Sequence, residues 1–86
     1  MAEVKRVIDG DTFETISGQR IRLAGVDAPE KGKPGSVKAT EKLASLVGDK
    51  NVAVNPVGVS YGRIVADVEV GGKSVNKSMQ RYLKKK

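Results

Sequence analysis

The sequence predicts a mainly β fold with helices (α+β), in the form of a small five-stranded Greek-key barrel of the OB type. The chain has 86 residues, the length of a single domain with a modest core. Five short segments alternate apolar and polar residues like half-buried strands, and two others repeat apolar residues at helical spacing. Their order is βββαββα, which suits such a barrel.

The first three strands are expected to form an antiparallel meander. Val4 to Ile8 reads as a strand and is closed by Asp9-Gly10, a hairpin dipeptide in which glycine tolerates a positive φ. Thr12 to Ile16 is rich in β-forming residues. Ser17-Gly18-Gln19 then makes a tight connection into a third strand that starts at Arg20.

The third strand leads into a group of acidic residues. Ile21 and Leu23 alternate with arginines, so the side chain of Arg22 should point away from the core, toward solvent or a ligand. Pro29 cannot continue a strand ladder, so the strand is expected to end near Val26. Asp27 and Glu30 should therefore lie on the rim of the barrel.

The first helix is expected after a flexible basic loop, Lys31 to Ser36. Apolar residues recur at i, i+4, i+7 and i+8 from Ala39 to Val47, which predicts a helix, and Gly48 is expected to cap it.

The second half of the chain predicts two strands and a helix. Asn51 to Asn55 and Ile64 to Val70 alternate as strands, and Pro56 to Ser60 between them is read as a short apolar loop. Ser74 is a candidate N-cap, followed by helical spacing from Val75 to Leu83.

Composition limits the possible functions. The chain lacks cysteine and histidine, which argues against disulfides and zinc chemistry and removes the commonest general base. A net charge of +6 favours nucleic acid as a partner, although a basic balance also serves solubility alone. No stretch is long or apolar enough for a membrane. No signal peptide opens the chain, so as it stands a cytoplasmic location is expected.

Two acids, Asp11 and Asp27, fall at strand ends that the barrel could bring together. Two nearby carboxylates repel each other, and an all-oxygen pocket suits a hard cation, Ca²⁺ or Mg²⁺. The alternative for Asp9-Gly10-Asp11 is a hairpin turn with one spare acid.

Three motifs in order resemble the staphylococcal nuclease (thermonuclease) family. They are Val7-Ile8-Asp9-Gly10-Asp11-Thr12, then Ile21-Arg22-Leu23 through Val26-Asp27-Ala28-Pro29-Glu30, then Tyr61-Gly62-Arg63, and the resemblance runs from Val4 to Leu83. It implies Ca²⁺ as cofactor and assigns the site residues as follows: Asp11, Asp27 and the carbonyl of Ala28 as metal ligands, Glu30 as general base, and Arg22 and Arg63 on the phosphate.

The resemblance also implies a function. The chain would be a calcium-dependent endonuclease acting on DNA and RNA, preferably single-stranded, and leaving 3′-phosphate ends. It would be a single domain, residues 1–86, that lacks the family's last C-terminal helix, and a monomer is expected. The family is often secreted.

Several alternatives stay open. Glu30 could be a solvated loop acid, and Arg63 an exposed strand residue paired with Asp67 or Glu69. Tyr61 could stack on a base, bond a phosphate, or cover the barrel edge.

Two rival functions remain as well. One is a non-catalytic nucleic-acid-binding OB module, against which the low aromatic content argues, since only Phe13, Tyr61 and Tyr82 are aromatic. The other is a metal-stabilised structural or protein-interaction domain, which would need the acids but not Arg22 and Arg63.

Overall fold

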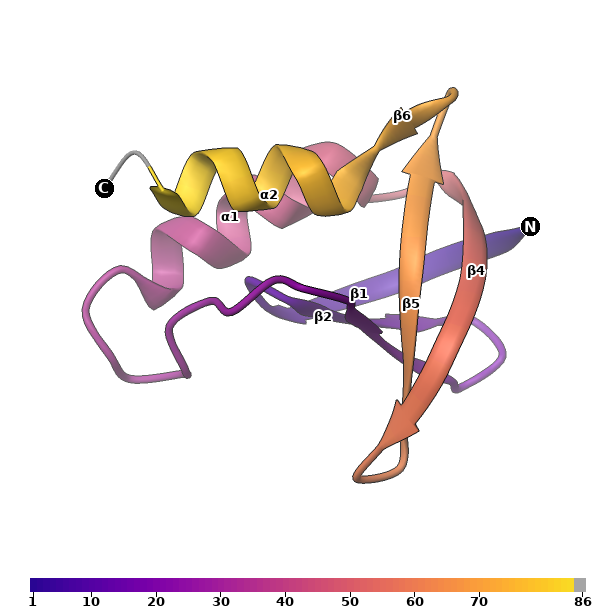
Figure 1. Cartoon of the computed structure of the whole chain (residues 1–86), viewed down its shortest axis with the longest axis horizontal. Helices are drawn as coiled ribbons and strands as arrows, with labels where there is room; N and C mark the ends of the chain where they lie inside the picture. The colour runs from indigo at the N-terminus through magenta and orange to yellow at the C-terminus, as the bar shows by residue number, and fades with distance from the viewer. Residues whose placement is uncertain (85–86) are drawn as a thin grey trace.

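The computed structural model describes residues 1–84, which form six strands and two helices (Figure 1). In chain order these elements are β1 (Ala2–Asp9), β2 (Thr12–Thr15), β3 (Arg20–Leu23), α1 (Ser36–Val47), β4 (Asn51–Ser60), β5 (Arg63–Val70), β6 (Lys73–Ser74) and α2 (Val75–Lys84).

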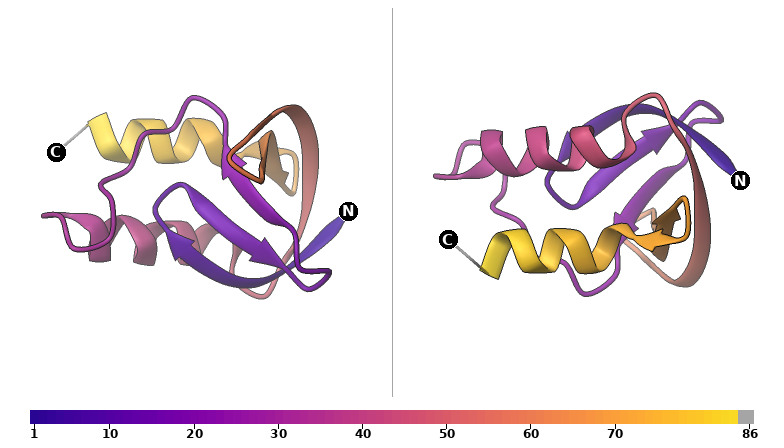
Figure 2. Two further views of the ribbon diagram at one scale, coloured as in Figure 1. Left: turned by 90° about the horizontal axis from the view of Figure 1, so that it is seen from below. Right: turned by 90° about the horizontal axis from the view of Figure 1, so that it is seen from above.

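Five of the strands close into a ring. β1 pairs with β2, β2 with β3, β5 with β4, and β4 with β1, all antiparallel. The ring is completed by the parallel pairing of β3 with β5, where Ile21 lies opposite Ile64. Figure 2 shows the strands curving around a common axis, with the helices beyond one end. The predicted α+β class and small OB-type barrel are thus confirmed, and β6 is a two-residue addition that pairs with β5 outside the ring.

Two predicted boundaries are wrong. β3 ends at Leu23 rather than near Val26, because the chain turns after Ala24: the Val26 N–H donates back to the Leu23 carbonyl, and the Val26 carbonyl accepts the Arg22 side chain. Pro56 to Ser60 is not a loop but the second half of β4, paired with β5 up to Ser60 opposite Arg63. Proline is accommodated there because a bulge interrupts the pairing between Pro56 and Gly58.

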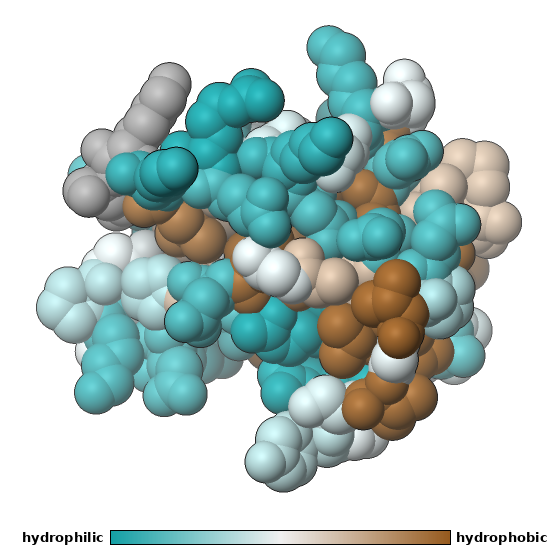
Figure 3. Space-filling view, in the orientation of Figure 1, coloured by the Kyte–Doolittle hydropathy of each residue, from teal (hydrophilic) through white to brown (hydrophobic). Residues whose placement is uncertain are grey.

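The second half of β4 exposes hydrophobic side chains. Val57 and Val59 are largely solvent-accessible, and Figure 3 shows hydrophobic surface gathered over this end of the barrel. β4 pairs with β5 along one edge, and with β1 along the other edge only at Asn51 and Val52. Within the described residues, that second edge of β4 is therefore unpaired along most of its length.

One core joins the barrel to the helices. α1 packs against β1, α2 packs against β5, and the two helices contact each other. The fully buried side chains come from every layer and include Phe13, Ile21, Leu23, Leu43, Val52, Val68 and Met79. Neither helix in the described part of the chain is long and apolar enough to cross a membrane.

Both helix caps predicted from the sequence are present. Ser74 Oγ accepts a hydrogen bond from the Lys77 backbone N–H at 3.1 Å, the geometry of an N-cap side chain. Gly48 ends α1 and donates its backbone N–H to the Ala44 carbonyl at 2.8 Å.

Candidate active site

A single polar cavity of about 190 Å³ gathers most of the residues singled out by sequence. They come from the β1–β2 turn, β3, the segment that follows β3, and the first residue of β5. The lining residues are Asp9, Asp11, Arg22, Asp27, Ala28, Glu30 and Arg63. Six of the seven were predicted site residues, and Asp9 is the addition.

The close approach of the two acidic segments depends on Gly10. A Cβ atom at Gly10 would lie 2.6 Å from Ala39 Cβ and 2.7 Å from Ala28 Cβ, so the turn fits against α1 and the Ala28 segment only without a side chain. The tolerance of glycine for a positive φ is not used at this position, because Gly10 is not among the positive-φ glycines of the structure. Its role is packing, which places Asp11 beside Ala28.

Asp11 is buried and bound by protein donors. One carboxylate oxygen accepts the Thr12 hydroxyl at 2.9 Å, and the other accepts the Ala28 backbone N–H at 3.2 Å. Burial raises the pKa of Asp11 above its usual range, and a hydrogen bond with the Asp9 carboxyl and repulsion from its charge raise it further. The cavity therefore holds two neighbouring acids, Asp9 and Asp11, with the Arg22 guanidinium 3.5 Å from the Asp11 carboxylate.

Asp9 was missed as a site residue because it was read only as part of the turn. Its Oδ1 accepts the Asp11 backbone N–H at 3.0 Å, which fixes the turn from inside. The available signal was the Asp-Gly-Asp spacing itself, because side chains two residues apart in an extended segment point to the same face.

The chemistry of the donors fits a hard cation such as Ca²⁺. Carboxylates of Asp11 and Asp27 and the Ala28 carbonyl are oxygen ligands, which calcium prefers, and calcium accepts irregular arrangements completed by water. Within residues 1–84 no three acids are grouped closely enough to hold a metal by themselves. The backbone carbonyl and water would therefore have to supply part of the shell.

The Arg22 side chain is engaged by the protein, whereas the alternation of residues in β3 predicted that it would point toward solvent or a ligand. Its Nη1 donates to the Leu23 and Val26 carbonyls, both at 2.7 Å, and Nη2 lies 3.5 Å from Asp11 Oδ2. Only 23% of its side chain is exposed. One edge of the guanidinium is thus used by the protein, and the remaining N–H groups are those available to a ligand in the cavity.

Residues of α2 hold the segment between β3 and Asp27. The side chain of Asn76 is buried, donates to the Ala24 and Ala66 carbonyls at 2.9 and 3.1 Å, and accepts the Val68 N–H at 2.8 Å. Gln80 donates to the Gly25 carbonyl at 2.9 Å. Neither residue stood out in the sequence, because one amide in an amphipathic helix carries no pattern that distinguishes a structural anchor from a surface side chain.

Arg63 lies at the junction of two cavities. It lines the acidic cavity and also a larger one of about 790 Å³ beside it. It forms no ion pair within residues 1–84, so the alternative of pairing with Asp67 or Glu69 is wrong. Its charge therefore remains available to an anion.

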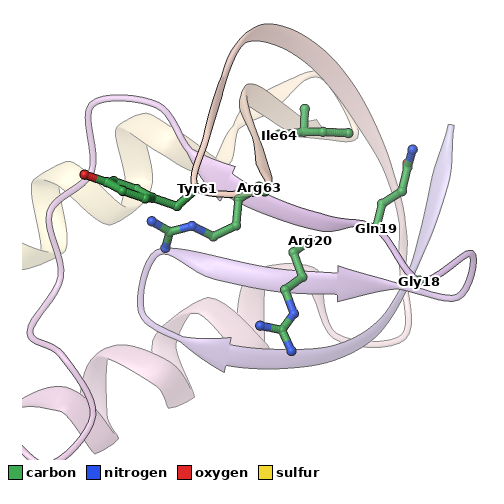
Figure 4. A pocket seen from close by; sticks show the side chains of 7 residues that line it. Gly18, Gln19, Arg20, Tyr61, Arg63 and Ile64 are labelled. Atoms are coloured by element: carbon green, nitrogen blue, oxygen red, sulfur yellow. The ribbon is translucent and has the colours of Figure 1, made fainter.

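Tyr61 lies apart from the acids. It belongs to the larger cavity, and in Figure 4 its side chain and that of Arg63 run in the same direction from the β4–β5 turn. The side chain is 94% exposed, so it does not cover the barrel edge. Contact with a ligand is the alternative that remains for this ring.

Comparison with known proteins relates most of the chain to one family. The family described as "Staphylococcal nuclease homologue" matches residues 20–82. An "Uncharacterized endonuclease" of Escherichia coli is 41% identical over 83 residues, covering 91% of this chain and 54% of the relative. A "Thermonuclease" of Staphylococcus intermedius is 38% identical over 85 residues, covering 85% of this chain and 51% of the relative.

A further relative, the "Micrococcal nuclease" of Shigella flexneri, is 39% identical over 70 residues, which cover 77% of this chain and 40% of that protein. The chain therefore spans about half the length of the curated relatives it matches.

Proposed function

The chain belongs to the staphylococcal nuclease family, and from that premise we propose that it is a calcium-dependent nuclease that hydrolyses phosphodiester bonds of DNA and RNA. One observation carries the proposal: a single cavity contains both acids suited to a cation and two arginines suited to a phosphate. Phosphodiester hydrolysis needs both kinds of group, because negative charge grows on the phosphoryl oxygens.

The cation would be held by Asp11, Asp27 and the carbonyl of Ala28, with Asp9 adding to the negative field. When bound, calcium supplies positive charge that stabilises the phosphoryl oxygens in the transition state. Burial, and after it the neighbouring Asp9, raise the pKa of Asp11, and the positive charge of a bound cation would offset both effects.

Glu30 is proposed as the general base. The protein has no histidine, and Glu30 is an exposed carboxylate in the same cavity with no ion pair within residues 1–84. It would take a proton from water as the water oxygen bonds to phosphorus and the bond from phosphorus to the 5′ oxygen breaks. The 5′ oxygen then takes a proton from solvent, so the products are a 3′-phosphate and a 5′-hydroxyl. Arg63 and the free N–H groups of Arg22 would bind the phosphoryl oxygens.

This arrangement agrees with a single-stranded substrate and with a protein that acts as a monomer. An unpaired strand can present a phosphate to the acidic cavity and a base to the exposed ring of Tyr61 at the same time. All the proposed groups lie on one chain, so no second copy is needed to complete the site.

The test is single-turnover cleavage of a labelled single-stranded oligonucleotide in Ca²⁺ and in EDTA. We expect cleavage only with Ca²⁺, and a rate about 10²- to 10⁴-fold lower for Glu30→Gln, which keeps the side-chain size but removes the base. Glu41→Gln is the matched control, because Glu41 is an exposed acid on α1 outside the cavity. Circular dichroism checks that each variant is folded.

Two outcomes would contradict the proposal. Equal rates for the parent, Glu30→Gln and Glu41→Gln would place the chemistry elsewhere or in a contaminant. A folded parent that binds the oligonucleotide with Ca²⁺ present but does not cleave it would favour the non-catalytic binding module.

A further inference from the structure

The larger cavity adjoins the proposed catalytic site and has the size and the groups of a ligand site. Its volume of about 790 Å³ falls in the range of about 300 to 1,000 Å³ typical of small-molecule pockets. It lies between the β2–β3 connection and the β4–β5 turn, and Arg63 is shared with the acidic cavity. A ligand in one cavity is therefore next to a ligand in the other.

Arg20 supplies a positive charge in this cavity, and the interaction of its side chain with the described residues is limited to a minor share in lowering the pKa of Glu14, behind the larger effect of Arg6. Its cross-strand neighbour Glu14 is already engaged, because the Arg6 Nε donates to the Glu14 carboxylate at 2.7 Å. Arg20 forms no ion pair itself within the described chain. Figure 4 shows Arg20 and Gln19 extending in different directions from the start of β3, so charge and amide groups lie at separate points of the wall.

Tyr61 occupies a backbone position that disfavours it. Ser60 pairs with Arg63, so Tyr61-Gly62 is a two-residue hairpin turn, and its φ values of 51° and 76° are both positive. Asparagine and glycine prefer this turn, whereas a bulky side chain there is strained. An exposed ring at a strained position contributes little to the fold, and such strain is commonly found at ligand sites.

We infer that the Arg20–Tyr61 cavity binds the nucleotide next to the cleaved bond, with the Tyr61 ring stacking on its base and Arg20 binding the following phosphate. The inference rests on the proposed function for its substrate, a single-stranded polynucleotide. It makes Arg20 a specificity residue: the protein favours strands that extend at least one phosphate beyond the cleaved one. A dinucleoside monophosphate has no such phosphate and gains nothing from Arg20.

The test compares Arg20→Gln with Arg81→Gln, an equal charge change on α2 outside the cavity. With Ca²⁺, Arg20→Gln should raise KM for a thymidine oligonucleotide about twofold to fivefold, the size of one exposed charge pair, and leave cleavage of the dinucleoside monophosphate unchanged. In EDTA, fluorescence anisotropy should show the slope of log affinity against log salt fall by about 0.7 for Arg20→Gln alone.

Substitutions of Tyr61 test the inference independently of Arg20. Tyr61→Asn should raise Tm by relieving the turn while it lowers oligonucleotide affinity, and Tyr61→Phe should keep the affinity. The inference is overturned if Arg20→Gln matches the parent, or if Arg20→Gln and Arg81→Gln lose affinity equally. If the parent binds but does not cleave, the anisotropy arms still decide the inference, so its failure is distinct from failure of the proposed function.

Discussion

At the scale of single residues, Arg22 and Arg63 show how surroundings separate two side chains with the same predicted role. Arg22 donates to two main-chain carbonyls and lies near Asp11, so it holds the segment that leads to Asp27 as well as facing the cavity. Arg63 has no ion-pair partner within residues 1–84. Its guanidinium is therefore free to bind substrate, while that of Arg22 is partly structural.

Lysine substitutions should separate these roles. Arg63→Lys keeps the charge but loses the planar fork, so single-turnover cleavage should fall about 10²-fold or more while the melting temperature stays unchanged. Arg22→Lys should also slow cleavage, and in addition it should cost about 1.5 to 3 kcal/mol of stability, because a lysine cannot reproduce both charged hydrogen bonds. Thermal unfolding in EDTA measures the difference. Equal melting temperatures for the two variants would refute the structural role of Arg22.

The sequence predicted residues by type more reliably than by role. The acids and arginines of the cavity were identifiable because the proposed chemistry needs carboxylates and guanidinium groups, and because all of them lie in or next to predicted strands. The packing role of Gly10 and the anchoring role of Asn76 were not, because each depends on neighbours distant in sequence: Ala39 for Gly10, and Ala24 for Asn76.

At the scale of elements, the site depends on a contact among small residues of a turn, a loop and a helix. Gly10 lies against Ala28 and Ala39 with no room for another carbon, and this contact sets the position of Asp11 relative to the Ala28 backbone. α1 therefore takes part in building the site without contributing a side chain to the cavity.

Gly10→Ala should disrupt the fold and the site together. Forcing a methyl group into this contact should cost about 1 to 3 kcal/mol, and the displaced turn should weaken calcium binding. Gly58→Ala in β4 is the control, because a Cβ there meets nothing within 4 Å and its φ is not positive. Denaturant unfolding and calcium titration measure both effects, and similar stabilities for the two variants would show that the contact is not limiting.

Helices and strands were predicted correctly where apolar residues recur at a regular spacing, and less well where they do not. Both helices and the alternating strands were located from apolar spacing. The second half of β4 was mistaken for a loop because proline and glycine usually interrupt strands, and a single sequence does not reveal a bulge that accommodates them.

At the scale of the whole molecule, the proposed cation site links calcium binding to the stability of the fold through the buried acid Asp11. Ca²⁺ that binds only the folded protein should stabilise it by about 1.4 kcal/mol at a tenfold excess over its dissociation constant, equivalent to roughly 6 to 11 °C for a domain of this size. Because the pKa of Asp11 is raised, protons compete with the cation, so the stabilisation should grow as pH rises through that pKa.

Differential scanning calorimetry with Ca²⁺ and with EDTA measures this linkage. Asp11→Asn should abolish the shift, whereas Asp67→Asn should retain it, because Asp67 is an exposed acid outside the cavity. If millimolar Ca²⁺ does not change the melting temperature of the parent protein, even with a nucleotide present, the result would count against the cation site.

The parallel pairing of β3 with β5 also bears on when the candidate site is completed during synthesis. It joins Ile21 to Ile64, so the ring cannot close until β5 has been made. Asp11, Arg22 and Asp27 leave the ribosome early, but Arg63 starts the strand that closes the ring. Such long-range closure is late in folding. A ribosome-bound fragment that ends before β5 would carry Asp11 and Asp27 but lack Arg63, so under the proposed function it would be inactive.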